Sequence, residues 1–183
     1  LDCNPEEWNC NGGWNPYEMF IGTDSCGEDG LVLGVVLPYA EVELTCECGN
    51  PRTNPYAFSY EGTIDEGLPF DEKVTAIKQA IMTFGPVWTT VHAGTTPFLA
   101  YSGGIFNYKP ASGGIDHAVV IEGWDDTRGN GVWILRNSWS NLWGDDGYMY
   151  IEYDSSLVGS YTDVMSYAGS PNGSIQVTLE PAA

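Results

Sequence analysis

The spacing of apolar and polar positions is most regular between residues 71 and 153, where it predicts one helix and four strands. Apolar residues three and four positions apart indicate a helix over Asp71 to Phe84, with Asp71 capping its start and Gly85-Pro86 ending it. Glycine- and aspartate-rich turns separate four strand-like segments, at 87–92, 117–124, 131–138 and 147–153. A helix followed by antiparallel strands predicts an α+β fold.

The chain on either side of this region is less regular. Residues 1–48 are rich in turn residues, and the prolines and glycines from Gly49 to Gly67 predict a segment that crosses from one lobe to another. We therefore expect a boundary near residue 50. The C-terminal end forms either a last strand or the start of a linker, and it contains the glycosylation sequon Asn172-Gly173-Ser174. The expected domains are 1–48, 49–170 and 171–183.

Composition and charge narrow the classes of function. A chain of 183 residues, 43% of them hydrophobic, can bury a substantial core. No apolar stretch approaches the roughly 20 residues that span a bilayer, so we expect no membrane segment and no signal peptide. The formal charge of −19 repels phosphates and anionic lipids, which argues against nucleic-acid and membrane partners. The scattered acidic residues suit an extracellular or cell-surface protein, although solubility alone would also explain them.

All five cysteines fall within the first 48 residues, which is typical of disulfide staples formed in an oxidising compartment. A zinc site is the alternative, but Cys46-Glu47-Cys48 lacks the usual spacer and neither histidine is near it. A calcium site in the acidic turn 125–131 is disfavoured because the turn lacks alternating oxygen ligands. We expect no metal and no cofactor. The odd number of cysteines leaves one sulfur for a partner outside this sequence.

Candidate chemistry centres on His117, which opens the apolar run 118–121. A core histidine with satisfied hydrogen bonds is one interpretation. Asn137, on the next predicted strand, favours another, because adjacent antiparallel strands can bring the two side chains together. An amide oxygen would then fix the imidazole's orientation and tautomer and leave its other nitrogen to hold a thiol as thiolate. Trp139 would cover that bond and exclude water.

Six sequence elements support this interpretation and occur in the order found in a known family. They are Asn9-Cys10-Asn11-Gly12-Gly13-Trp14, Pro38-Tyr39, Gly85-Pro86-Val87, Tyr101-Ser102-Gly103-Gly104-Ile105-Phe106, Asp116-His117-Ala118-Val119, and Asn137-Ser138-Trp139 with Trp143-Gly144-Asp145-Asp146-Gly147-Tyr148. Over residues 1–153 the chain thus resembles the papain family of cysteine peptidases. The resemblance implies a two-lobe fold, with part of a helical lobe and a lobe built on an antiparallel β-sheet or barrel.

The resemblance also implies roles for particular residues. His117 would be the general acid and base, Asn137 its orienting partner and Trp139 the shield over their hydrogen bond. A polypeptide substrate would lie in a groove and pair with backbone amides as an added strand. The implied substrate-binding residues are Gly12, Gly13, Trp14, Thr90, Asp116 and Ala118.

The chain departs from the family at the nucleophile. No Cys-Gly-Ser-Cys-Trp type string is present, Cys26 lacks that context, and no oxyanion glutamine precedes the cysteine-rich region. In the family the cysteine matching Cys10 is bridged to one just before the nucleophile, so we expect a missing N-terminal segment or chain linked through Cys10. The simplest implied disulfides are Cys3–Cys46 and Cys26–Cys48, and other pairings are allowed.

Three functions share these features. The leading expectation is a cysteine-type endopeptidase for which this chain supplies the histidine and the asparagine. The alternative is a catalytically inactive papain-like binding or structural module at the cell surface, suggested by the absent nucleophile. The third is acyl transfer to an amine in place of water, which uses the same catalytic groups.

Overall fold

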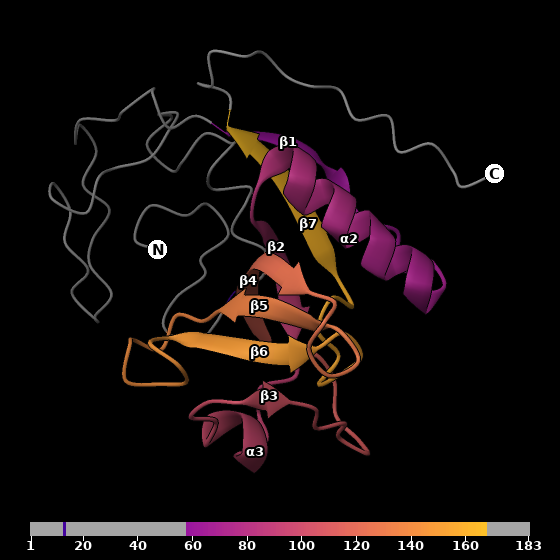
Figure 1. Ribbon diagram of the computed structural model, residues 1–183. Coiled ribbons are helices and arrows are strands. Elements are labelled where there is room, and N and C mark those ends of the chain that lie inside the picture. The colour runs from indigo at the N-terminus through magenta and orange to yellow at the C-terminus, as the bar shows by residue number, and fades with distance from the viewer. Residues whose placement is uncertain (1–12, 14–57, 168–183) are drawn as a thin grey trace, which may run out of the picture. The chain divides into compact units, whose positions relative to one another are not determined.

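The computed structural model describes Gly13 and residues 58–167 (Figure 1). Several predicted features lie outside these residues, namely Gly12, Trp14, the five cysteines with their expected disulfides, the boundary near residue 50 and the segment 171–183. The chain divides into two compact units, and the second contains nearly all described residues, 61–164. No helix within residues 58–167 is both long enough and apolar enough to cross a bilayer.

A sheet of seven strands forms the described part of the fold, in the order β1-β7-β2-β4-β5-β6-β3. Strand β2 pairs antiparallel with β4 and β7, β4 with β5, and β5 with β6, whereas β3 runs parallel to β6. Together with two helices this is an α+β fold, as the sequence predicted. The elements are β1 (Phe58–Thr63), α2 (Phe70–Phe84), β2 (Val87–Val91), α3 (Thr96–Leu99), β3 (Ile105–Phe106), β4 (His117–Asp125), β5 (Val132–Arg136), β6 (Tyr148–Glu152) and β7 (Thr162–Tyr167).

The predicted helix and the four predicted strands are present as α2, β2, β4, β5 and β6, with ends that differ by one or two residues. The predicted cap is wrong. Pro69 is the N-cap, no side chain caps the helix, and Asp71 already lies in the first turn. Its carboxylate can therefore act on the helix dipole but cannot occupy the non-helical position that a cap requires. Gly85 ends the helix with φ 93°, a backbone conformation that favours glycine.

Helix α2 packs on the sheet through strands β2 and β4 (Figure 1). Ile77 and Ala80 are its buried residues and join the apolar core, and burying a side chain such as Ile77 contributes about 1.5–3 kcal/mol. All five residues of β2 are buried, so this central strand is covered on both faces. Thr89 on β2 satisfies its buried hydroxyl by a 2.8 Å hydrogen bond to the Thr162 hydroxyl. The result is a fully buried central strand beside β4, the strand that begins with His117.

Candidate active site

The register between β4 and β5 brings His117 and Asn137 together. Val120 pairs with Arg136 at the end of the ladder, so the first residues of β4 lie beside the chain that follows β5. There His117 Nε2 lies 2.8 Å from Asn137 Oδ1. The two side chains that the sequence predicted as neighbours are in hydrogen-bond contact.

The hydrogen bonds at Asn137 determine the tautomer of His117. The Ser138 backbone N–H donates to the same Asn137 Oδ1 at 2.8 Å, so this atom is an acceptor and His117 Nε2 is the donor. Neutral His117 therefore carries its proton on Nε2, which leaves Nδ1 with a lone pair. An imidazole held this way can accept a proton at Nδ1 without changing its contact to the amide.

Asn137 is itself held by the protein backbone. Its N–H donates to the Gly147 carbonyl at 3.0 Å, and the residue is 9% exposed. Its side-chain Nδ2 is buried and has no hydrogen-bond partner among the described residues. The side-chain amide is thus positioned by the hydrogen bonds of its oxygen and by the backbone hydrogen bond of the residue.

Trp139 covers the imidazole. Its ring stacks on His117 with centroids 4.8 Å apart and planes 30° apart. Phe98 and Trp143 meet the Trp139 ring edge-on, with centroids 5.8 Å and 5.4 Å from its own. The aromatic cluster of Phe98, Trp139 and Trp143 therefore packs next to the imidazole of His117.

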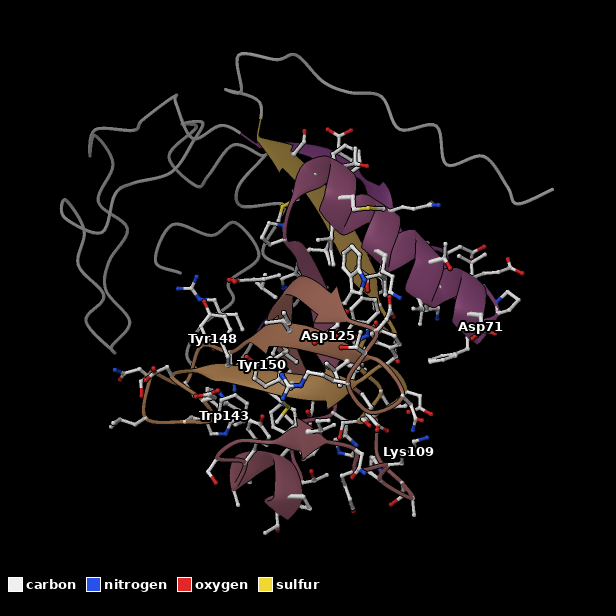
Figure 2. The ribbon with its side chains drawn as sticks, in the orientation of Figure 1. Asp71, Lys109, Asp125, Trp143, Tyr148 and Tyr150 are labelled. Carbon is white, nitrogen blue, oxygen red and sulfur yellow. The ribbon has the colours of Figure 1, made fainter. Side chains whose placement is uncertain are left out.

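The cluster is supported by the segment around Tyr101. Trp143 Nε1 donates to the Phe98 carbonyl at 3.3 Å. The Tyr101 hydroxyl donates to the Gly104 carbonyl at 2.7 Å and accepts the Tyr150 N–H at 3.2 Å. Burial of Tyr101 raises the pKa of its phenol. Figure 2 shows Trp143 near the end of β6 where Tyr148 starts the strand.

Asp116 binds the backbone that follows β2. Its carboxylate oxygens accept the N–H groups of Ala93 at 2.7 Å and Gly94 at 2.9 Å. Its own N–H donates to the Val91 carbonyl at 3.1 Å. Asp116 thus ties the end of β2 to the residue immediately before His117.

Thr90 and Ala118 are paired across β2 and β4. Thr90 is 3% exposed, and its hydroxyl accepts the Tyr161 N–H at 3.2 Å. Of the predicted site residues, the structure therefore gathers Thr90, Asp116, His117, Ala118, Asn137 and Trp139 at one end of β4. Gly13 is described as exposed and belongs to the other unit.

Two residues at this end of the sheet were not predicted from the sequence. Phe98 is fully buried against Trp139, and no local pattern distinguishes it from other core phenylalanines. His92 is buried next to Asp116. Its only sequence signal was the scarcity of histidine, which occurs twice in the chain.

The acidic turn after β4 uses its carboxylates for local contacts. Asp125 Oδ1 accepts the backbone N–H and the hydroxyl of Thr127, at 2.8 Å and 2.7 Å. Asp126 Oδ1 accepts from Lys78 at 2.6 Å and from the Tyr153 hydroxyl at 2.7 Å. In the described part of the chain, no group of three or more His, Cys, Asp or Glu side chains could hold a metal ion.

Comparison with known proteins identifies the class to which this arrangement belongs. The family described as papain family cysteine protease matches residues 1–168. The chain is therefore a member of the papain family.

Individual relatives agree with this assignment. The chain is 29% identical to cathepsin O of Homo sapiens over 177 residues, and 33% identical to cathepsin Q of Rattus norvegicus over 159 residues. These alignments cover 91% and 84% of this chain but 49% and 44% of the relatives, so the chain spans slightly less than half of their length.

Solved structures show the same fold. Bromelain from Ananas comosus, in complex with the E64 inhibitor, superposes with a TM-score of 0.66 at 27% identity, covering 90% of this chain and 73% of bromelain. A chain from a study of the mite allergens Blo t 1 and Der p 1 gives a TM-score of 0.72 at 26% identity, covering 88% and 51% of the two chains. The expected papain-like fold is confirmed.

Proposed function

We propose that this chain provides the catalytic base of a cysteine-type endopeptidase. The observation that carries the proposal is the 2.8 Å contact between His117 Nε2 and Asn137 Oδ1 beneath the stacked Trp139 ring. In a papain-family chain this arrangement presents the free Nδ1 of a fixed imidazole. Such a group can both remove a proton from a thiol and return it to a leaving amine.

The proposed reaction has two halves. His117 Nδ1 takes the thiol proton, and the thiolate attacks the peptide carbonyl. The imidazolium then gives its proton to the leaving amine as the C–N bond breaks, which leaves an acyl-enzyme. A water molecule then attacks the acyl group while Nδ1 accepts its proton, and that proton returns to the sulfur as the C–S bond breaks. Asn137 keeps Nε2–H occupied throughout, so Nδ1 is the only atom of the ring that exchanges protons.

We propose that the thiol belongs to a segment or chain of the same protein outside residues 1–183. None of the five cysteines lies in the family's nucleophile string. A disulfide through Cys10 would link the two parts. The proposed steps involve side chains, the substrate and water, and they use neither a metal ion nor an organic cofactor.

A polypeptide is the proposed substrate. Thr90 and Ala118, paired across β2 and β4 next to His117, would contact a substrate side chain. By the family resemblance, Gly12 and Gly13 would pair with the substrate backbone, Trp14 would contribute to substrate binding, and Asp116 would flank the scissile bond. Two other expectations stay predictions. They are the domain limits, at 1–48, 49–170 and 171–183, and an extracellular or cell-surface location.

The experiment uses the native protein as isolated from its source. A thiol-directed epoxide or vinyl sulfone probe is applied, and the labelled peptide is identified by mass spectrometry. We expect label on a cysteine outside residues 1–183, and we expect prior denaturation to abolish labelling. Label on Cys26, or no label on a preparation whose intact mass matches the full protein, contradicts the proposal.

The second candidate is a non-catalytic papain-like module at the cell surface. The specific observation in its favour is that the chain has no cysteine in the nucleophile context. N-terminal sequencing and intact mass of the native, non-reduced protein separate the two candidates, because a protein without a further segment lacks the thiol. Acyl transfer to an amine shares the same site, and analysis of the products formed with an added amine distinguishes it from hydrolysis.

A further inference from the structure

A second histidine lies close to the candidate base and has no part in the proposed reaction. His92 follows directly after β2 and is 8% exposed. Its Nε2 lies 3.6 Å from Asp116 Oδ2. Its Nδ1 is buried and has no hydrogen-bond partner among the described residues.

Two glycines leave room for this arrangement. A Cβ on Gly113 would lie 2.0 Å from His92 Cε1, and Gly113 has φ 112°, so a side chain is excluded on both grounds. A Cβ on Gly94 would lie 2.4 Å from Asp116 Oδ2. The imidazole and the carboxylate are thus each in close contact with bare backbone, which is how a protein confines a side chain to one position.

The surroundings of His92 favour one tautomer of its neutral ring. Asp116 is the charged group that faces the ring. The Ser156 carbonyl accepts the backbone N–H of His92 at 2.7 Å, so this bond does not involve the ring, and Asp154, two residues before Ser156, pairs with Lys109. A proton on Nδ1 would be a buried donor without an acceptor, which is costly. The neutral ring with its proton on Nε2, directed at Asp116, avoids that cost.

We propose that His92 is a positioning residue for His117 and acts through Asp116. The Ala93 and Gly94 N–H groups already bind the carboxylate, and His92 Nε2–H lies close to the same carboxylate. The present separation of 3.6 Å is longer than a hydrogen bond. The contact is electrostatic at that distance and becomes a hydrogen bond after a small approach.

The consequence reaches His117 because Asp116 is its neighbour in the chain. Asp116 N–H binds the Val91 carbonyl, and Val91 pairs with His117 across β2 and β4. A carboxylate that shifts would carry the start of β4 with it, and errors of about 1 Å in a catalytic group can cost as much as 10²-fold in rate. This effect on rate rests on the proposed function, whereas the tautomer and contacts of His92 do not.

Three substitutions distinguish the effect of losing the Nε2–H donor from the effect of losing the volume of the ring. In His92→Gln the side-chain amide nitrogen can replace Nε2, in His92→Asn it can replace only Nδ1, and His92→Met has neither donor. We expect Asn and Met to lower kcat roughly tenfold with KM changed less than about twofold. Gln is expected to recover kcat to within about threefold. Equal kcat in all three variants, or an effect confined to KM, overturns the proposal.

A spectroscopic measurement on the unmodified protein is independent of catalysis. Two-dimensional ¹H–¹⁵N NMR of native protein labelled with ¹⁵N-histidine, with the His92 signals assigned by their loss in His92→Gln, reports the tautomer of the ring. We expect the Nε2–H tautomer and not the Nδ1–H tautomer. The Nδ1–H form overturns the proposal. If the thiol probe finds no nucleophile while NMR shows the Nε2–H form, the proposed function fails and the contact to Asp116 stands.

Discussion

One amide oxygen performs two tasks in the candidate site. Asn137 Oδ1 accepts from both His117 Nε2 and the Ser138 backbone N–H. The same atom therefore orients the imidazole and holds the turn that leaves β5, so the position of the base depends on the path of the chain beyond Arg136. Trp139, two residues further on, lies over the imidazole because of that path.

Asn137→Ala tests this arrangement. Without the amide, the imidazole can rotate and exchange tautomers, so we expect kcat/KM of the native assembly to fall on the order of 10²-fold. The free energy of unfolding should fall by about 1 kcal/mol, because the hydrogen bonds to Oδ1 are lost. Steady-state kinetics with a fluorogenic peptide and urea denaturation measure the two effects.

The matched control for this variant is Asn141→Ala, an exposed asparagine in the loop after Trp139. It should change either quantity little. If both variants lose activity equally, the loss comes from the loop and not from the contact to His117.

At this scale the sequence predicted contacts that depend on strand register. His117, Asn137 and Trp139 lie on or next to neighbouring strands, and the structure places them in contact, although their catalytic roles stay predictions. His92 could not be predicted in the same way. Its surroundings are the space above Gly113 and a carboxylate 24 residues away, and neither leaves a local pattern in the sequence.

At the scale of elements, Asp126 joins three parts of the fold. It lies in the turn after β4 and binds Lys78 of α2 and the hydroxyl of Tyr153, which follows β6. The Lys78 ammonium also lies over the Tyr153 ring, 4.7 Å from its centroid. Hydrogen bonds from Lys78, and then from Tyr153, lower the pKa of Asp126, while burial and the nearby carboxylate raise the pKa of Tyr153.

The Asp126 contacts predict an acid dependence of stability. A carboxyl group whose pKa is lower in the folded state stabilises the fold above its unfolded pKa, here 3.8, and loses that contribution as the pH falls through its folded pKa. Asp126→Asn should therefore be less stable than wild type near pH 7, and the difference should shrink below about pH 4. Because Asp126 is exposed, we expect a modest effect.

Urea denaturation at intervals from about pH 2.5 to pH 7 gives the required comparison. The control is Asp146→Asn, since this exposed residue has φ 51°, which asparagine tolerates. If the free energies of unfolding of wild type and Asp126→Asn differ by the same amount across this range, the negative charge of Asp126 does not contribute to stability, and the prediction is wrong.

Element lengths explain only part of what the sequence predicted, because β1 has six residues and still lies in the segment expected to cross between lobes. Helix α2 and strands β2, β4, β5 and β6 are long enough to show a 3.6- or 2-residue period. Helix α3 has four residues and β3 has two, which is too short for either period. Strand β7 was missed for a different reason, because Thr162 and Asp163 are polar and yet fully buried beside β2. Their hydroxyl and carboxylate find partners that only the assembled sheet supplies.

At the scale of the whole molecule, the main feature is a large negative net charge. The chain has twenty-five acidic and six basic residues, which gives a formal net charge of −19. Such a field attracts cationic ligands and repels anionic ones, and salt screens it over about 10 Å at 0.1 M.

Salt should therefore act differently on differently charged substrates. Between about 0.02 M and 0.3 M NaCl, we expect kcat/KM of the native assembly to fall roughly 3- to 10-fold for a peptide with several lysines outside the cleaved bond. For a neutral peptide with the same cleaved residues it should change less than about twofold. Parallel progress curves at each salt concentration measure both values, and equal slopes for the two peptides would contradict electrostatic attraction.

The stacked and hydrogen-bonded imidazole has one more consequence, which concerns entropy. His117 receives its amide partner and its indole cover from residues that fold with it, at positions 137 and 139. Its rotational freedom is therefore lost when the sheet forms and not when a peptide arrives. In the proposed reaction the loss of freedom on binding would fall on the substrate alone, so a peptide held rigidly in its extended form should be bound more tightly than a flexible one with the same contacts.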